Sequence, residues 1–203
     1  MDEARAVREY WFGTAPLTPE ALEQRMHHLW FGEPGAAQDE EIRSRFGALV
    51  ERAAAGGLAV WADGPRRRLS LILLLDQFPR NIHRGTARAF EGDEQALALT
   101  LSGMQSGADG ALDPAERLFF YMPLQHAENL EAQDEALAAG RRLLAEVPPE
   151  LHATFEGTLR AAEQHHAIIE RFGRFPHRNH ALGRESTPEE AKWLSEGGAS
   201  FGQ

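Results

Sequence analysis

The chain has 203 residues, which is long enough for one well-buried core and short for two. Its 42% hydrophobic and 26% charged residues are typical of a soluble globular protein, and the absence of cysteine excludes disulfides, thiol catalysis and thiolate metal sites. A net charge of −10 argues against a general binder of nucleic acid or of anionic membranes, because such proteins rely on broad basic surfaces.

Neither a membrane segment nor a cofactor motif is apparent. The longest apolar run, residues 71–75, is far too short to span a bilayer, and the acidic N-terminal residues show no secretory signal. We therefore expect a cytoplasmic protein without a membrane partner. The chain also lacks a Walker-type phosphate loop, a Gly-x-Gly-x-x-Gly fingerprint and a His-Glu-x-x-His zinc motif, so we predict no cofactor and no metal.

Apolar residues recur at helical spacing along the chain, and no stretch shows sustained strand alternation. Proline at the first helical position after Thr18, Asp113 and Thr187 marks three helix starts. These signals predict an all-α protein of antiparallel helical hairpins that forms a single domain over residues 1–203. The expected helices are 3–12, 19–30, 39–55, 63–78, 91–106, 113–121, 124–146, 149–172 and 188–196.

The expected helix that ends at Phe78 contains Leu69 and the run 71–75, and it is apolar nearly all round. A helix without a polar face belongs in the middle of a domain. Two later helices show narrower apolar stripes that we expect to be buried. These stripes are Leu130, Leu137 and Leu144 in the helix 124–146, and Leu151, Phe155, Leu159, Ala162 and Ile169 in the helix 149–172.

A Phe-Pro step that leads into an Arg-Asn pair occurs twice, at residues 78–81 (the first corner) and 175–179 (the second corner). Proline removes a backbone donor and blocks a regular helix, so each corner should lie at a kink or a helix end. There Arg and Asn can donate to the freed carbonyls. Both corners lie in stretches without acidic residues, 77–89 and 171–184. We interpret them as parts of one polar pocket; the alternative is two separate surface loops.

Asp76 is the most informative single carboxylate. At 100° per residue it lies about 20° from Leu69, on the face of the apolar helix itself. A buried carboxylate is costly unless it is paired, and Arg80 lies four residues later on the same face. One interpretation is that Asp76 orients Arg80 toward an anionic ligand or acts as a general base. The other is a structural ion pair that closes the helix end.

Three histidines are candidates for acid–base chemistry. His126 lies about 40° from the stripe that begins at Leu130, so it should face inward, either as an acid–base group or as a satisfied core residue. His165 and His166 lie on either side of the stripe of their helix, so one should face the pocket and the other a neighbouring helix. Glu163 and His166 have the spacing of a Glu-x-x-His metal pair, but the chain has no second such pair.

Five segments together are similar to a known family. They are Tyr10-Trp11-Phe12-Gly13, Leu29-Trp30-Phe31-Gly32, the run 71–81 that ends in Asp76-Gln77-Phe78-Pro79-Arg80-Asn81, residues 122–129, and Phe175-Pro176-His177-Arg178-Asn179-His180. Through them the chain resembles the bacterial "domain of unknown function 924" family over nearly its whole length. The resemblance implies an all-helical fold similar to a tetratricopeptide-like right-handed superhelix, and it supplies no activity.

The leading hypothesis is a site for a small anionic ligand, a carboxylate or a phosphate, because planar Arg forks bind such groups bidentately and Asn amides read neighbouring oxygens. If the site is catalytic, the expected catalytic residues are His126, Asp76 and His166. The alternative is a helical-repeat interaction module that binds an acidic peptide or a protein partner. The predicted ligand-binding residues are Gln77, Arg80, Asn81, His165, Arg178, Asn179 and His180.

Overall fold

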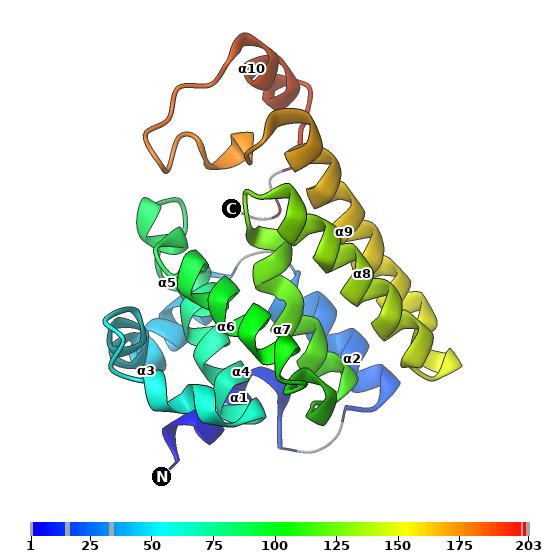
Figure 1. Cartoon of the computed structure of the whole chain (residues 1–203). Helices are drawn as coiled ribbons and strands as arrows, with labels where there is room; N and C mark the ends of the chain where they lie inside the picture. The colour runs from blue at the N-terminus through cyan, green and yellow to red at the C-terminus, as the bar shows by residue number, and fades with distance from the viewer. Residues whose placement is uncertain (1, 15–16, 33–34, 200, 202–203) are drawn as a thin grey trace.

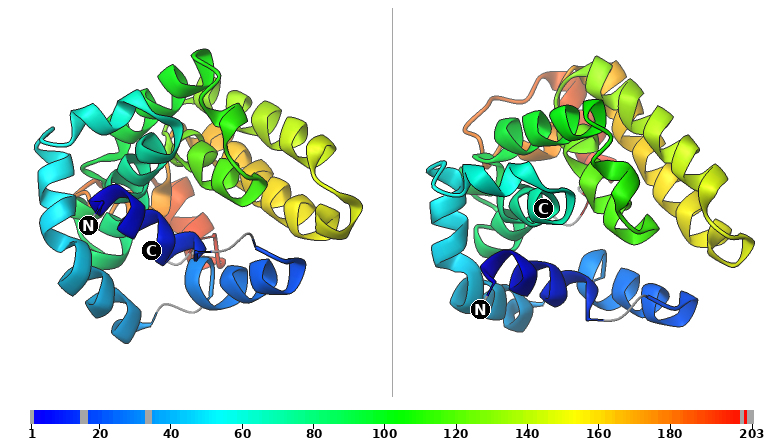
Figure 2. Two further views of the ribbon diagram at one scale, coloured as in Figure 1. Left: turned by 90° about the horizontal axis from the view of Figure 1, so that it is seen from below. Right: turned by 60° about the horizontal axis from the view of Figure 1, so that its bottom comes forward.

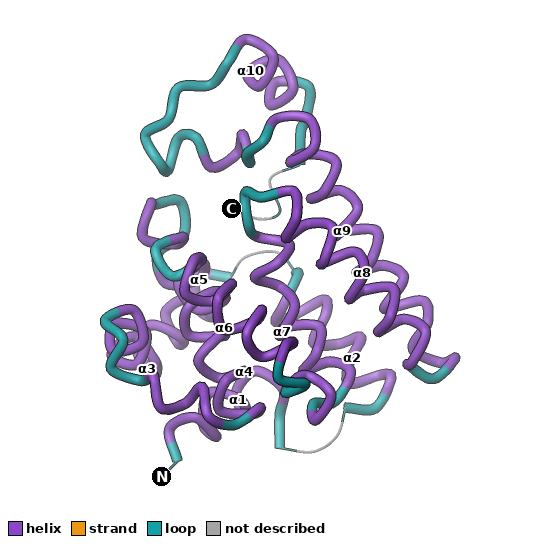
Figure 3. The backbone as a smooth tube through the Cα atoms, viewed as in Figure 1, coloured by secondary structure: helices purple, strands orange, loops and turns teal. Residues whose placement is uncertain are grey.

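The computed structural model of the chain describes residues 2–14, 17–32, 35–199 and 201. Within these residues every regular element is a helix and none is a strand (Figure 3), which confirms the all-α prediction. The finer expectations of a tetratricopeptide-like superhelix and of a single domain stay predictions. No helix in the described part of the chain combines the length and the apolar character that crossing a membrane requires.

The α-helices vary in length, and short π- and 3₁₀-helices lie between many of them. The α-helices are α1 (Glu3–Phe12), α2 (Pro19–Arg25), α3 (Ala36–Ala54), α4 (Pro65–Ile72), α5 (Phe78–Ile82), α6 (Asp93–Gln105), α7 (Pro114–His126), α8 (Leu130–Glu146), α9 (His152–Phe172) and α10 (Pro188–Ser195). The π-helices are η1 (Met26–Trp30) and η3 (Leu73–Gln77). The 3₁₀-helices are η2 (Ala59–Asp63), η4 (Ala87–Phe90), η5 (Asp109–Ala111), η6 (Pro149–Leu151) and η7 (Pro176–Arg178).

Consecutive helices pack on one another through much of the molecule: α6 on α7, α7 on α8, and α8 on α9. Helix α1 packs on α4 instead, and α3 packs on α5. In the views of Figures 1 and 2, α3 and the α8–α9 pair lie at opposite sides of the molecule. At the end of α9 the chain turns into η7 and α10, which contact each other at the top of Figure 1.

The apolar segment that contains α4 and η3 forms the centre of the core, as predicted. Leu69 and residues 71–75 are each at most 4% exposed. Aromatic rings surround this segment: Trp11 lies 5.4 Å from Phe78 and 5.5 Å from Phe119, measured between ring centroids. Close packing on every side holds the segment rigidly, and this segment carries Asp76 and the first corner.

The Phe-Pro step predicts that the helix ends at Phe78, but the helical path continues beyond it. It widens into the π-helix η3, in which the Phe78 N–H donates to the Leu73 carbonyl, and it then continues as α5 to Ile82. Pro79 lies in the first turn of α5, where its missing N–H has little effect. Single π-turns within α-helices occur frequently at functional sites. Here the π-turn keeps Asp76 and Arg80 on one continuous helical path.

The expected break between the helices 113–121 and 124–146 is also in the wrong place. Pro123 lies inside α7, which continues to His126. Helix α8 begins only at Leu130, because the Asn129 side chain accepts a hydrogen bond from the Ala132 N–H at 3.2 Å and caps the new helix. His126 therefore lies in the last turn of α7 and not in the first turn of the following helix.

The predicted stripe of α8 is wrong, whereas that of α9 is largely confirmed. Leu130 is 44% exposed, and Leu137 and Leu144 are only partly buried. Helix α8 packs on both α7 and α9, and at such close contacts small side chains set the distance between helices. The residues that α8 buries are Ala132, Gln133, Ala136, Ala139 and Leu143. From the predicted stripe of α9, the buried residues are Phe155, Ala162 and Ile169.

Candidate functional site

A cavity of about 510 Å³ lies where several parts of the chain meet. Its walls come mainly from η1 and the residues after it, the junction of η3 and α5, the end of α7, the middle of α9, and η7. Single residues of α1, α3 and the C-terminal segment complete the lining: Trp11, Gln38 and Phe201. Both corners contribute, through Arg80 and Asn81 from the first and His177 and Arg178 from the second. Among the described residues that line the cavity are three arginines and four histidines, and none is Asp or Glu. Because both corners line one cavity, they are not two separate surface loops, which was the alternative interpretation.

Arg80 and two carboxylates form a buried ionic cluster behind the cavity wall. Arg80 Nη1 and Nη2 donate to the two carboxylate oxygens of Asp93 at 2.8 and 2.9 Å. Arg80 Nη1 also donates to the main-chain oxygen of Asp76 at 2.5 Å and lies 3.3 Å from Asp76 Oδ1. Arg80 thus bonds a main-chain oxygen next to Leu75, whose own carbonyl is the one that Pro79 leaves without an N–H donor. Most of the Arg80 guanidinium is used within the protein.

Arg178 of the second corner contacts Asp93 of the same cluster. Its Nη1 donates to the main-chain oxygen of His126 at 3.0 Å and to Asp93 Oδ2 at 3.4 Å. Its guanidinium carbon lies 4.7 Å from the Phe90 ring centroid and 4.4 Å from that of Phe175, so the cation is held by two rings. Burial, with the nearby charge of Arg80, lowers the pKa of Arg178 to about 10, so it stays charged at neutral pH. No described group bonds to its Nη2.

His126 is oriented by Asp76. The distance from His126 Nδ1 to Asp76 Oδ1 is 2.7 Å. Burial alone would raise the pKa of Asp76, but Arg80, His126 and a 2.6 Å hydrogen bond from Gln77 hold that pKa well below its ordinary value. Asp76 is therefore a carboxylate that can only accept, and Nδ1 of His126 carries the proton. Burial and the charge of Arg80 lower the pKa of His126, so the ring is neutral at neutral pH.

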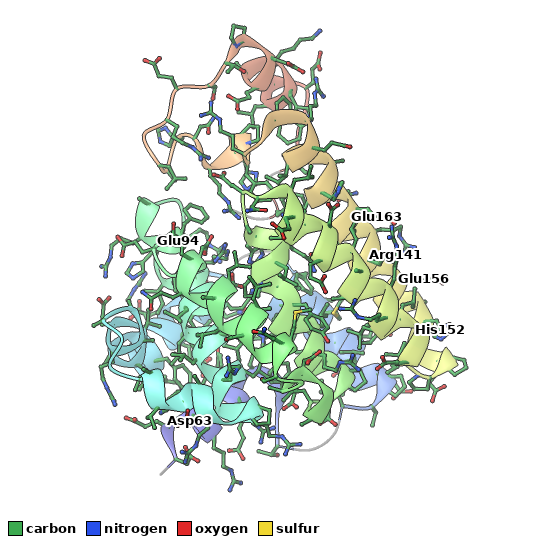
Figure 4. The ribbon with its side chains drawn as sticks, viewed as in Figure 1. Asp63, Glu94, Arg141, His152, Glu156 and Glu163 are labelled. Atoms are coloured by element: carbon green, nitrogen blue, oxygen red, sulfur yellow. The ribbon has the colours of Figure 1, made fainter. Side chains whose placement is uncertain are left out.

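His165 and His166 point in different directions, as expected. His165 lines the cavity, and its Nδ1 lies 2.8 Å from the main-chain oxygen of Ala161. Burial and the neighbouring His126 lower the pKa of His165 to about 3. His166 lies outside the cavity lining and pairs with Asp134 on α8 at 2.8 Å. Glu163 is exposed on the outer side of α9 (Figure 4), away from the cavity.

The remaining predicted ligand residues divide between the cavity and its support. Gln77 and Asn81 line the cavity, and Asn81 Nδ2 donates to Asp39 at 3.0 Å. Asn179, the last residue of the second corner, does not line the cavity; its amide donates to Ser186 and Glu190, so its role here is structural. His180 is exposed and does not line the cavity.

Glu128 fixes the second corner in place. Its carboxylate accepts the Phe175 N–H at 2.8 Å and two bonds from Arg184, at 2.6 and 2.9 Å. Burial opposes ionisation, but the Arg184 guanidinium holds the pKa of Glu128 below its usual value. Glu128 lies in the short connection between α7 and α8, two residues after His126, and its bond to Phe175 ties the segment that carries Arg178 to this connection.

Unpaired buried polar atoms are concentrated at this site. Among the described residues, six buried side-chain nitrogen or oxygen atoms have no hydrogen-bond partner. Four of the six belong to residues that line the cavity: Trp11 Nε1, Arg80 Nε, His177 Nδ1 and Arg178 Nε. Native proteins pair nearly all such atoms, and exceptions gather where function requires them. In the described chain no three His, Asp or Glu side chains are grouped as metal ligands.

The profile of a family described as "bacterial protein of unknown function (DUF924)" matches residues 7–198, which is nearly the whole chain. The chain belongs to the DUF924 family. Its fold is similar to that of a solved protein of unknown function from Agrobacterium tumefaciens, with 36% sequence identity and a TM-score of 0.79. The match covers 96% of this chain and 97% of the other. A comparison with curated proteins found no match.

Several residues at the site of this DUF924 protein were not predicted. Asp93, which bonds both corner arginines, begins α6 in an acidic stretch that resembles an ordinary helix start, so no local pattern marks it. His177 and Arg84 line the cavity and lie in the two stretches without acidic residues, so the sequence contained a signal for them. Trp30 and Phe201 enter the cavity wall only through tertiary packing.

Acid is expected to destabilise the DUF924 protein through its buried cavity histidines. Burial lowers the pKa of His165 to about 3, and burial with the charge of Arg178 lowers that of His177 to about 4, against 6.5 for an unperturbed histidine. Between pH 6.5 and these values the unfolded chain binds the extra protons, so stability is present above pH 6.5 and lost below it. Each histidine should contribute about 1.4 kcal/mol per pH unit to the loss.

The measurement is urea denaturation at intervals from pH 8 to pH 4.5. His165→Phe keeps an aromatic ring against Phe201, whose centroid lies 3.7 Å away, and should reduce the slope by about 1.4 kcal/mol per pH unit. The difference between the two proteins at pH 8 measures the change in packing together with the loss of the hydrogen bond to Ala161. An unchanged slope in the variant would contradict the assignment of this titration to His165.

Proposed function

We propose that the cavity binds a small anionic molecule, a carboxylate or phosphate, and that His126 acts on it as a general base. The observation that carries the proposal is the convergence of both arginine-bearing corners on one wall that also contains His126 and no described carboxylate. A volume of about 510 Å³ is in the usual range for small-molecule sites and supports a small ligand over a peptide.

Arg178 is the principal anion contact in this proposal. The two phenyl rings and the Nη1 bonds to His126 and Asp93 fix the plane of its guanidinium. Nη2 has no described partner, so a carboxylate or phosphate oxygen in the cavity can accept from it. A prepositioned guanidinium loses little entropy on binding. Arg80 contributes charge, and its own donors are mainly bonded to Asp76 and Asp93.

The base would be Nε2 of His126. Because Asp76 accepts from Nδ1, the lone pair of the neutral ring is on Nε2, and no described group bonds to that atom. A carboxylate that holds the imidazole in one tautomer and stabilises the imidazolium formed on proton transfer is a recurrent arrangement in acid–base catalysis. Arg178, bonded to the main chain of the same histidine, would keep the anion within reach of that nitrogen.

Anion binding can be tested by thermal unfolding in the presence of benzoate or inorganic phosphate at constant ionic strength. A probe at about 100 times its Kd should stabilise the protein by about 2.7 kcal/mol. Arg178→Met should remove most of this shift, because a charge-assisted hydrogen bond contributes about 1.5–3 kcal/mol. Asp93 would keep its two bonds to Arg80, so the variant should remain folded.

Arg171→Met is the matched control, since Arg171 is half exposed and pairs with Glu189 outside the cavity. It should leave the probe-induced shift unchanged. Arg178→Lys keeps the charge and loses the planar fork, and it should show an intermediate shift. Equal shifts in the methionine variants of Arg178 and Arg171 would overturn the proposal, as would the absence of any shift with either probe.

A further inference from the structure

Two histidines at the cavity have their protons fixed on the same ring atom. His126 Nδ1 lies 2.7 Å from a carboxylate oxygen of Asp76, and His165 Nδ1 lies 2.8 Å from the main-chain oxygen of Ala161. Carboxylate and carbonyl oxygens only accept, so in both neutral rings Nδ1 is the donor. The Nε2 atom of each ring is then an acceptor, and no described group donates to either. The two ring centroids lie 6.1 Å apart.

These acceptors restrict what can bind beside Arg178. A plain carboxylate presents only lone pairs, which suit the guanidinium and repel the lone pairs of the two Nε2 atoms. Polar atoms that a bound ligand covers from water are costly when they face no partner. A ligand that satisfies the whole wall must therefore bring an acidic group together with at least one O–H or N–H donor.

The other wall of the cavity is apolar. Met26, Leu29 and Trp30 come from η1, Met122 from α7 and Phe201 from the C-terminal segment. Phe201 also stacks on His165, with centroids 3.7 Å apart and 20° between the ring planes. Burial of apolar surface against such a wall adds affinity in proportion to the area covered. A small polar anion such as glycolate would leave it uncovered.

We propose that the ligand is an organic acid with a hydroxyl or amino donor next to its acidic group and an apolar, preferably aromatic, body. This inference rests on the proposed anion site and specifies the class of molecule that it takes. The acid group would bind Arg178 Nη2, and the body would lie on Trp30 and the two methionines. The donor would lie between the Nε2 atoms of His126 and His165, where a hydroxyl would share its one proton between the two acceptors and an amino group would donate to both. The proton of this O–H or N–H group is the one that Nε2 of His126 would accept.

The test compares three probes by isothermal titration with the wild-type protein: phenylacetate, each enantiomer of mandelate, and glycolate. Mandelate and phenylacetate differ only in the hydroxyl, and glycolate lacks the ring of mandelate. One mandelate enantiomer should bind at least about tenfold more tightly than phenylacetate, because the hydroxyl pairs with otherwise unpaired acceptors. Glycolate should bind at least about tenfold more weakly than mandelate.

Variants then assign the preference to the histidines. His165→Phe should reduce the ratio of mandelate to phenylacetate affinity to about threefold or less, whereas His166→Phe, on the next residue and outside the cavity, should leave it unchanged. Equal binding of mandelate and phenylacetate to the wild-type protein would overturn this inference and leave the anion site standing. Absence of binding by all three acids would overturn this inference, and the anion site would fall with it only if benzoate and inorganic phosphate also give no shift. If a variant does not fold, the affinities of the wild-type protein for mandelate and phenylacetate still test the inference.

Discussion

Replacement of Arg80 by methionine is expected to lower the free energy of unfolding by about 3–5 kcal/mol, which is typical when one partner of a buried ion pair is removed. The side chain of Arg80 is 8% exposed and that of Asp76 is fully buried. Without the guanidinium, Asp76 keeps His126 and Gln77 as partners, and Asp93 keeps only the longer contact with Arg178. Urea denaturation monitored by circular dichroism measures the loss.

An exposed ion pair provides the control. Arg5 is 69% exposed and pairs with Glu9, so Arg5→Met should change stability by no more than about 1 kcal/mol. The double variant Arg80→Met, Asp93→Asn removes one of the two stranded charges and should recover part of the loss. A loss below about 1 kcal/mol in the single variant would show that the cluster of Arg80, Asp76 and Asp93 does not hold the first corner.

The second large effect is expected from Gly92→Ala. A Cβ at this position would lie 2.3 Å from the main-chain oxygen of Leu75, a distance that real Cβ atoms essentially never show. Pro79, four residues after Leu75, has no N–H to donate to that oxygen, and the backbone at Gly92 packs directly against it. The added Cβ meets main-chain atoms, which cannot swing aside as the end of a flexible side chain can, so the change should cost about 1–3 kcal/mol or more and shift Asp93, the next residue.

Gly64 is a matched control, because it is also the N-cap residue of an α-helix and a Cβ there would meet nothing within 4 Å. Gly64→Ala should change the free energy of unfolding by about 1 kcal/mol or less. Because Asp93 bonds Arg80 and Arg178, Gly92→Ala should also weaken anion binding beyond its effect on stability. Similar stabilities for the two alanine variants would contradict the close approach of α6 to η3.

Much of the fold could be predicted because the decisive signals are local. Thr18 and Thr187 each accept a hydrogen bond from a backbone N–H three residues later, and both helices begin as the Ser/Thr-Pro pattern predicts. The continuous apolar run 71–75 was correctly placed at the centre of the core because no polar face was available to meet solvent.

The errors occurred where tertiary contacts outweigh local preference. Pro123 does not end its helix, since α7 is packed between α6, α8 and the core segment α4, and such contacts can hold a helix together across one missing hydrogen bond. The leucine stripe of α8 was misleading because contact with two helices selects alanine, and Leu130 is left exposed.

The two corners could be assigned to one pocket from their composition, but the carboxylate that joins them could not. Asp93 looks like any acidic residue in the first turn of a helix, and only the fold brings it to Arg80 and Arg178. In the same way, the pattern placed His165 and His166 on either side of one stripe. The contacts of Ala161 and Asp134 decide which of them reaches the cavity.

The two π-helices have a consequence for chain length. A π-turn holds one residue more than an α-turn, and one residue corresponds to a rotation of about 100° around the helix axis. Loss of a single leucine between Leu73 and Leu75 would let η3 close as an ordinary α-turn, which keeps the helices on either side in phase and leaves Arg80 facing Asp93. The same loss within α4 would turn Arg80 by about 100° relative to the residues before the deletion. The π-turn thus makes this part of the core segment tolerant of a one-residue deletion.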